Sequence, residues 1–160
     1  MSELRVGTGV DAHAFEPGVP LVLGGVEIPF DRGLAGHSDG DVVAHALIDA
    51  LLGAAGLGDI GTLFPSGDET HRGASSLGLL AETYIPVRES GFELVNADCV
   101  LVGEEPRIGE HREEMRGRLA AALSVEPDRV NVRATTTDRL GFTGRGEGLA
   151  AVAVALLRRL

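Results

Sequence analysis

Strand-like and helix-like segments alternate along the whole chain, and this order constrains the fold more than any other feature of the sequence. Apolar runs of strand or helix periodicity predict strands at 6–15, 21–23, 26–28, 92–102, 130–136 and 149–157, and helices at 40–54, 75–90 and 106–123. Because the two kinds of element are interspersed, the pattern favours an α/β (α+β) fold, in which a mixed β-sheet carries helices packed on one face and a short hairpin is added.

Local signals refine these boundaries. Gly24 and Gly25 separate the segments 21–23 and 26–28, which is typical of a tight hairpin. Ser38 or Asp39 is expected to cap the helix at 40–54. The Ala-rich segment 149–157 is compatible with a short helix, but a strand is favoured.

Two prolines and a glycine-rich stretch interrupt the regular pattern. Pro86 predicts a kink in the helix at 75–90, or its early end. Pro106 suits the first turn of the helix that runs to 123. Residues 56–72 are rich in Gly, Pro and acids and are expected to form a long loop, a kind of segment that often carries function.

Composition limits the classes of protein that this chain can belong to. A length of 160 residues fits a single domain over 1–160. The net charge of −10 argues against binding to nucleic acid, and the absence of Lys excludes lysine-based catalysis. No apolar run is long enough to span a membrane, and the N-terminus does not resemble a signal peptide, so a cytoplasmic protein is expected. The single cysteine, Cys99, is expected in the core.

A candidate metal site is formed by one carboxylate and two imidazoles. Asp11 and His13 lie two positions apart on a predicted strand and therefore share a face, while His45 lies on the helix at 40–54. These three ligands suit Zn²⁺ or a similar divalent cation and would leave a fourth position open, as in catalytic sites. The alternative is a polar strand pair and a helix histidine that hydrogen-bonds to Asp41 or Asp49. In a metal site, Asp49 is the expected outer partner of His45.

Two further groups of polar residues suit phosphate. His37 and Ser38 precede the helix at 40–54, whose N-terminus can bind an anion, although an ordinary capping sequence explains them equally well. The segment 135–138 (TTTD) leaves a predicted strand and offers oxygens for phosphate and for a second cation such as Mg²⁺. A polar hairpin is the alternative there.

The remaining candidates carry weaker signals. Asp59 can bind a substrate hydroxyl between apolar neighbours, or it can simply belong to a structural loop. His71 and His111 have polar neighbours and no evident partner, so both are expected to be exposed to solvent.

Three motifs, in this order and spacing, resemble the 2-C-methyl-D-erythritol 2,4-cyclodiphosphate synthases of the non-mevalonate isoprenoid pathway. They are GVDAHAF at 9–15, GHSDGDVVAHALIDALLGAAGLGDIGTLFP at 36–65 and ATTTDRLGFTGRGEG at 134–148, and the resemblance extends over nearly the whole chain. It implies an α/β subunit that assembles as a homotrimer, with active sites between neighbouring subunits.

The resemblance also implies roles for individual residues. Asp11, His13 and His45 match zinc ligands, and His37 and Thr136 match the catalytic positions that stabilise the transition state. Asp138 stands where the family usually has Glu, a ligand of Mg²⁺ or Mn²⁺ at the substrate diphosphate. Ser66 replaces a frequent Asp. The residues that match substrate-binding positions are Asp11, Ala12, His13, His37, Ser38, Asp59, Ile60, Gly61, Phe64, Asp68, Pro106, Arg107, Thr135, Thr136, Thr137, Asp138, Phe142 and Arg145.

Within that set, the resemblance assigns residues 59–61 to the methylerythritol skeleton, with Phe64 and Asp68 in a mobile loop beside it. Residues 103–109 and 135–137 are implied to bind cytidine from the neighbouring subunit. Phe142 and Arg145 match positions near the trimer axis, where some members hold an isoprenoid diphosphate.

The implied activity is that of a phosphorus–oxygen lyase. It converts 4-diphosphocytidyl-2-C-methyl-D-erythritol 2-phosphate into 2-C-methyl-D-erythritol 2,4-cyclodiphosphate and CMP by metal-assisted intramolecular phosphoryl transfer. Two alternatives use the same residues: a metal-dependent phosphohydrolase, and a non-catalytic trimer that binds isoprenoid diphosphates.

Overall fold

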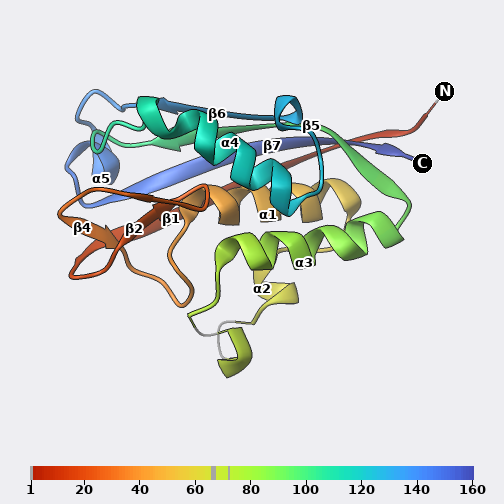
Figure 1. Ribbon diagram of the computed structural model, residues 1–160, viewed down its shortest axis with the longest axis horizontal. Helices are drawn as coiled ribbons and strands as arrows, with labels where there is room; N and C mark the ends of the chain where they lie inside the picture. Colours follow the sequence, from red (N-terminus) through yellow and green to blue (C-terminus); the bar gives the residue numbers. More distant parts are fainter. Residues whose placement is uncertain (1, 66–67, 72) are drawn as a thin grey trace.

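The computed structural model describes residues 2–65, 68–71 and 73–160 (Figure 1). The strands are β1 (Leu4–Pro17), β2 (Leu21–Leu23), β3 (Val26–Ile28), β4 (Arg32–Leu34), β5 (Phe92–Val102), β6 (Val130–Thr135) and β7 (Gly148–Arg159). The α-helices are α1 (Val42–Ala55), α2 (Ile60–Leu63), α3 (Ser76–Glu89), α4 (Arg112–Ala122) and α5 (Gly141–Gly144), and short 3₁₀ turns lie at Glu69–His71, Gly109–His111 and Pro127–Arg129.

Five strands form one mixed sheet in the order β4-β1-β7-β5-β6. The pairs β1–β4, β1–β7 and β5–β7 are antiparallel, and β5–β6 is parallel. Strands β2 and β3 form the separate hairpin that the two glycines predict. The segment 149–157 lies within β7, the central strand of the sheet, which confirms the preference for a strand.

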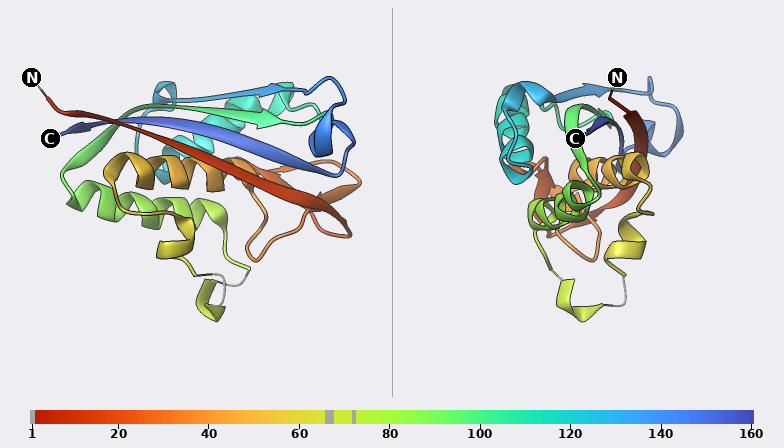
Figure 2. Two further views of the ribbon diagram at one scale, coloured as in Figure 1. Left: turned by 180° about the vertical axis from the view of Figure 1, so that it is seen from behind. Right: turned by 90° about the vertical axis from the view of Figure 1, so that its right-hand side faces the viewer.

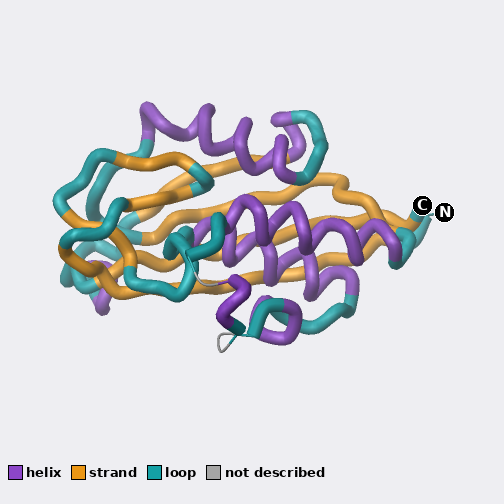
Figure 3. The backbone as a smooth tube through the Cα atoms, turned by 60° about the horizontal axis from the view of Figure 1, so that its bottom comes forward, coloured by secondary structure: helices purple, strands orange, loops and turns teal. Residues whose placement is uncertain are grey.

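The long helices cover one face of the sheet, as predicted. Helix α1 packs against β1 and β7, and α3 runs beside α1, as Figures 2 and 3 show. The α1 side of β7 is fully buried, with Ala151 and Ala153 at 0% exposure. The opposite face of the sheet exposes apolar side chains of β1 and β7, namely Val6, Val10, Val152 and Val154.

Two glycines bring β1 and α1 into direct contact. A Cβ atom on Gly9 would lie 1.9 Å from the carbonyl oxygen of Ala46, and one on Gly7 would lie 2.1 Å from that of Ala50. Any side chain at these positions would push the helix away. Because side chains alternate along a strand, Asp11 and His13 lie on the same face as these glycines and point toward α1.

The N-cap of α1 is Asp41 rather than Ser38 or Asp39. Its carboxylate accepts a hydrogen bond from the N–H of Ala44 at 3.0 Å, and also from the N–H groups of Gly24 (2.9 Å) and Gly25 (2.7 Å). Burial outweighs these bonds and raises the pKa of Asp41 to about 6. This single fully buried carboxylate therefore ties the β2–β3 turn to the start of α1.

Several expected boundaries were wrong. Pro106 lies three residues before the turn at Gly109–His111, and α4 itself begins only at Arg112. Pro86 lies inside α3, which runs to Glu89, so the helix does not end early, and the alternative of a kink stays a prediction. The described part of 56–72 contains α2 and a 3₁₀ turn rather than only loop, and the short edge strand β4 was not predicted.

Two other observations concern the core and the helix lengths. Cys99 is fully buried, as predicted, and burial raises the pKa of its thiol to about 12. Among the described residues, no helix has the length and apolar character needed to cross a membrane.

Candidate metal and substrate site

Asp11, His13 and His45 converge at the interface of β1 and α1. The Oδ2 atom of Asp11 lies 2.8 Å from Nε2 of His13 and 3.1 Å from Nδ1 of His45. The two imidazole nitrogens are 3.4 Å apart. One atom from each side chain thus faces a common point, and no other such group occurs among the described residues.

The separations of these three atoms fit a tetrahedral metal site. An ion such as Zn²⁺, with bonds of about 2.0–2.1 Å, separates its ligand atoms by about 3.3 Å, close to the observed distances. His13 also hydrogen-bonds to the backbone of Ala35, which orients its ring. The three residues therefore suit a divalent cation and leave one position for another ligand.

The proximity of these groups perturbs their protonation. Burial alone would raise the pKa of Asp11, but hydrogen bonds from His13 and His45 outweigh it and lower that pKa to about 2. The hydrogen bond to Asp11 raises the pKa of His13 above its usual value. The carboxylate is therefore ionised at neutral pH, as a metal ligand must be.

The far side of the His45 ring faces two serines rather than an acid. Its Nε2 lies 2.8 Å from Oγ of Ser76 and 3.0 Å from Oγ of Ser38. The expected partner, Asp49, instead accepts a hydrogen bond from the N–H of Ile60 at 2.7 Å. Among the described hydrogen bonds, none joins Asp49 to His45. Ser76 is the outer partner of His45 instead.

A cavity of about 440 Å³ opens beside the three candidate ligands. Residues expected to contact substrate line it together with the metal group, and the full lining is Asp11, His13, His37, Ser38, His45, Ile60, Gly61, Phe64, Pro65, His71 and Leu79. The strand β1, the start of α1, helix α2 and the start of α3 thus contribute to one site. The lining combines carboxylate and imidazole groups with apolar side chains.

The sequence analysis missed three lining residues, Pro65, His71 and Leu79. His71 is partly buried, and its ring packs edge-on against Phe64 with centroids 5.0 Å apart. The expectation that it is exposed to solvent was therefore only partly correct, and the same holds for His111, whose side chain is 20% exposed. In the sequence, the only local sign of this contact was Phe64, seven positions before His71.

Two acids of the predicted substrate pocket make local contacts instead of lining this cavity. Asp59 caps α2 and accepts hydrogen bonds from the backbone N–H and hydroxyl of Thr62, both at 2.8 Å. Asp68 accepts a hydrogen bond from the N–H of Thr70 at 3.0 Å. Ser66 lies outside the described residues. Roles in substrate binding for Asp59 and Asp68 stay predictions.

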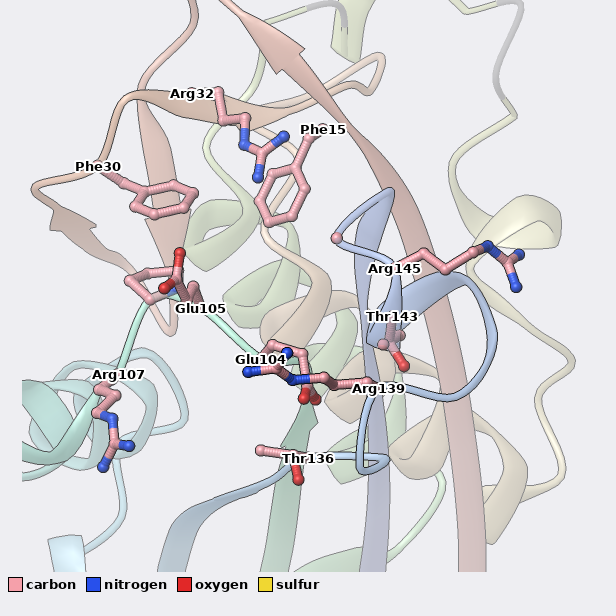
Figure 4. A pocket seen from close by; sticks show the side chains of 13 residues that line it. Phe15, Phe30, Arg32, Glu104, Glu105, Arg107, Thr136, Arg139, Thr143 and Arg145 are labelled. Atoms are coloured by element: carbon pink, nitrogen blue, oxygen red, sulfur yellow. The ribbon is translucent and has the colours of Figure 1, made fainter.

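A second region of cavities lies where β5 and β6 end. The larger cavity, of about 760 Å³, includes Pro106, Arg107 and Thr136 in its lining, and an adjoining one of about 330 Å³ adds Thr135. In Figure 4, the Arg32 side chain points between Phe15 and Phe30, at 4.3 Å from the first ring centroid and 5.6 Å from the second.

The remaining predicted residues surround this second region or lie apart from it. The backbone at Asp138 is left-handed (φ 52°), and its N–H donates to Oγ1 of Thr136. The Thr137 hydroxyl donates a hydrogen bond to the carbonyl of Leu140 at 2.6 Å. Arg145 belongs to the lining of the large cavity, although its side chain extends away from the other labelled residues in Figure 4. Phe142 is exposed on α5. Ala12 lies on the face of β1 opposite to Asp11 and His13.

The predicted residues therefore fall into two groups within one chain. Asp11, His13 and His45 line the first cavity, whereas Thr135 and Thr136 line the second region. None of the described cavities contains members of both groups.

Comparisons with known proteins agree on the family. The model of the YgbB family matches residues 4–158. The 2-C-methyl-D-erythritol 2,4-cyclodiphosphate synthase of Rubrobacter xylanophilus is 62% identical over 162 residues, which cover 99% of this chain and 98% of that protein.

Two solved structures have the same fold. The bifunctional IspDF of Campylobacter jejuni has a TM-score of 0.96 and 45% identity, and the match covers all of this chain but only 43% of that one. The CDP complex of IspF from Plasmodium falciparum has a TM-score of 0.85 and 28% identity, with 99% of this chain and 98% of that one covered. From the family model and these relatives together, the chain belongs to the YgbB family.

Proposed function

We propose that this protein converts 4-diphosphocytidyl-2-C-methyl-D-erythritol 2-phosphate into 2-C-methyl-D-erythritol 2,4-cyclodiphosphate and CMP. The observation that carries the proposal is the meeting of Asp11, His13 and His45 beside a cavity, in a chain 62% identical to a named synthase of this reaction. An oxygen of the 2-phosphate attacks the β-phosphorus of the diphosphate. The bond from that phosphorus to the bridging oxygen breaks, and CMP leaves with the electron pair.

Asp11, His13 and His45 would hold a divalent cation, with Zn²⁺ as the first candidate. A bound cation of this kind orients phosphate oxygens and withdraws charge from them as a Lewis acid. The side chains of β1 and α1 supply the rigid frame for this group, because the glycine contacts fix the distance between strand and helix. Phosphoryl transfer depends mainly on such positioning and on charge neutralisation.

Other residues of the first cavity are assigned to the substrate. His37 and Ser38 lie just before α1 and can donate hydrogen bonds to phosphate oxygens. Ile60, Phe64 and Leu79 provide an apolar wall for the methylated carbon skeleton. By surrounding the reacting phosphates, this wall would also reduce hydrolysis, the competing reaction.

We further propose a homotrimer in which each active site combines two copies of this single-domain chain. The exposed apolar face of β1 and β7 supports such an assembly, since Val6, Val10, Val152 and Val154 would otherwise face water. Thr135, Thr136 and the 103–109 segment of one copy would bind cytidine and diphosphate beside the metal group of the next. Asp138 would hold Mg²⁺ or Mn²⁺, and the trimer axis near Phe142 and Arg145 could accept an isoprenoid diphosphate. The cytoplasmic location stays a prediction.

The direct test is product analysis of the purified protein with the cytidine-containing substrate. We expect equal amounts of CMP and cyclic diphosphate, which ³¹P NMR distinguishes from open-chain products. His45→Ala should abolish both metal binding and turnover while the protein remains folded, because one of three ligands is lost.

Other products would favour the alternatives. Free phosphate or an open diphosphate would identify a phosphohydrolase that uses water as the nucleophile. Binding of an isoprenoid diphosphate without turnover of any cytidine diphosphate would identify a non-catalytic trimer. An H45A protein that keeps stoichiometric metal and normal turnover would contradict the ligand assignment.

A further inference from the structure

A buried serine connects the metal group to a carboxylate that belongs to neither cavity lining. Ser76, the first residue of α3, is fully buried, and its Oγ lies 2.8 Å from Nε2 of His45. The same hydroxyl makes a short hydrogen bond to Oδ1 of Asp39. Asp39 Oδ2 also accepts the backbone N–H of Ser76 at 3.0 Å, so the carboxylate holds this residue by two atoms.

The chemistry of these groups determines the direction of each hydrogen bond. An ionised carboxylate can only accept, so the single hydroxyl hydrogen of Ser76 must point to Asp39. The oxygen of Ser76 can then only accept a hydrogen bond from His45. The contact with Ser76 is therefore a hydrogen bond only in the tautomer with the hydrogen on Nε2, which leaves the lone pair on Nδ1. In the metal-free protein this tautomer competes with the one in which Nδ1 donates its hydrogen to Asp11.

That lone pair faces the proposed metal position. Nδ1 of His45 is the atom that lies 3.1 Å from Oδ2 of Asp11 and 3.4 Å from Nε2 of His13. Only an unprotonated imidazole nitrogen can bind a cation. A ring with the opposite tautomer would present an N–H group to the ion and would have to exchange its proton before binding.

We propose that Ser76 and Asp39 form a positioning relay that fixes the tautomer and orientation of His45 for metal binding. The inference rests on the proposed function only in naming that ring as a metal ligand. Neither Ser76 nor Asp39 supplies one of the three ligand atoms, so both residues act through His45.

Ser38 also contacts His45 but is not anchored in the same way. Its Oγ lies 3.0 Å from Nε2 and 3.3 Å from Oγ of Ser76, and its described hydrogen bonds include none to a carboxylate. Its hydroxyl hydrogen is therefore free to turn toward a phosphate in the cavity. The two serines have different tasks: Ser76 orients the ligand, and Ser38 remains available to substrate.

The first experiment measures the tautomer without any metal. In ¹⁵N-histidine NMR spectra of the metal-free protein, recorded where the His45 ring is neutral, the wild type should show the Nε2–H tautomer as the larger share, even though Asp11 favours a hydrogen on Nδ1. Ser76→Ala and Asp39→Asn should shift the signals toward a mixture of tautomers. Ser75→Ala is the matched control, because Ser75 caps the same helix through the N–H of Gly78 and does not contact His45 in the described structure.

The second experiment measures the affinity for Zn²⁺ by competition with a chelator, and records the visible spectrum of the Co²⁺ form. Loss of an outer partner of a histidine ligand typically weakens metal binding by about 10–100-fold, so S76A and D39N should fall in this range. S75A should bind within about twofold of the wild type. Circular dichroism checks that every variant is folded, and D39N keeps the assay informative if S76A does not fold.

The outcomes separate this inference from the proposed function. A single Nε2–H tautomer in folded S76A, or Zn²⁺ affinity equal to that of S75A, would overturn the relay. A wild type that binds no divalent cation would overturn the metal site, but the NMR comparison would still decide whether Ser76 sets the tautomer. If S76A keeps catalysing cyclisation only at raised Zn²⁺ concentration, both ideas are supported.

Discussion

At the scale of single residues, the pair Asp11–His13 behaves oppositely at the two ends of the pH range. The pKa of Asp11 falls from 3.8 to about 2, so its stabilising contribution is present above pH 3.8 and is lost toward pH 2. The pKa of His13 is raised from 6.5, so its contribution is full below pH 6.5 and disappears as the pH rises through the raised value. The pair therefore contributes most to stability between these limits.

We expect Asp11→Asn to destabilise the metal-free protein by about 1–2 kcal/mol in the range of about pH 4–6.5, because the charged hydrogen bond to His13 is lost. The difference from the wild type should shrink below and above this range. Urea unfolding followed by circular dichroism, in the presence of a chelator, measures it. A difference that stays constant from acid to alkaline pH would contradict the assignment.

At the scale of elements, the contact between β1 and α1 sets the geometry of the metal group. Asp11 and His13 belong to the strand and His45 to the helix, so their distances depend on how closely the two elements approach. That approach is controlled by Gly7 and Gly9 and not by any residue of the site itself.

Gly9→Ala should therefore damage metal binding from a distance. The new methyl group would overlap the carbonyl of Ala46, and we expect a loss of stability of about 3 kcal/mol or more together with weakened Zn²⁺ binding. Gly117→Ala is the control, because a Cβ there has no neighbouring atom within 4 Å and Ala favours helix. Thermal unfolding and zinc competition of both variants test this, and a G9A protein that matches G117A in both would refute it.

The elements themselves could largely be predicted from the sequence, because strand and helix periodicities are local. The hairpin at Gly24–Gly25 and the range of β5 follow from residues close in the chain. The N-cap of α1 could not be chosen, because Ser38, Asp39 and Asp41 can all cap a helix. The decision depends on the N–H groups of Gly24 and Gly25, which the fold brings to Asp41.

The same physical reason explains which site residues were found. The spacing of Asp11, His13 and His45 fitted a metal site but left a polar strand pair and a hydrogen-bonded helix histidine as the alternative, and the family resemblance favoured the metal site. Ser76 gave no signal, since it is one of two adjacent serines and its partner His45 lies 31 positions away. Contacts of this length depend on tertiary packing, which no local pattern encodes.

At the scale of the whole molecule, the uncovered face of the sheet determines the expected assembly. Val154→Glu would place a charge on that face, and we expect the proposed trimer to dissociate because the apolar contact would have to bury a carboxylate. Ile85→Glu is the matched control, since Ile85 is also an exposed apolar residue but lies on α3. Analytical ultracentrifugation measures the masses, and equal behaviour of V154E and I85E would exclude this face as the interface.

The separation of the two cavity regions has a consequence for mixtures of defective subunits. His45→Ala removes a residue of the first cavity and Thr136→Ala removes one of the second, so each homogeneous protein should be inactive. If a site takes one region from each of two neighbours, equal mixing after dissociation should repair about one site in four, where both intact regions meet by chance. Activity that returns on mixing, measured as CMP release, would show that each active site forms between two chains and not within one.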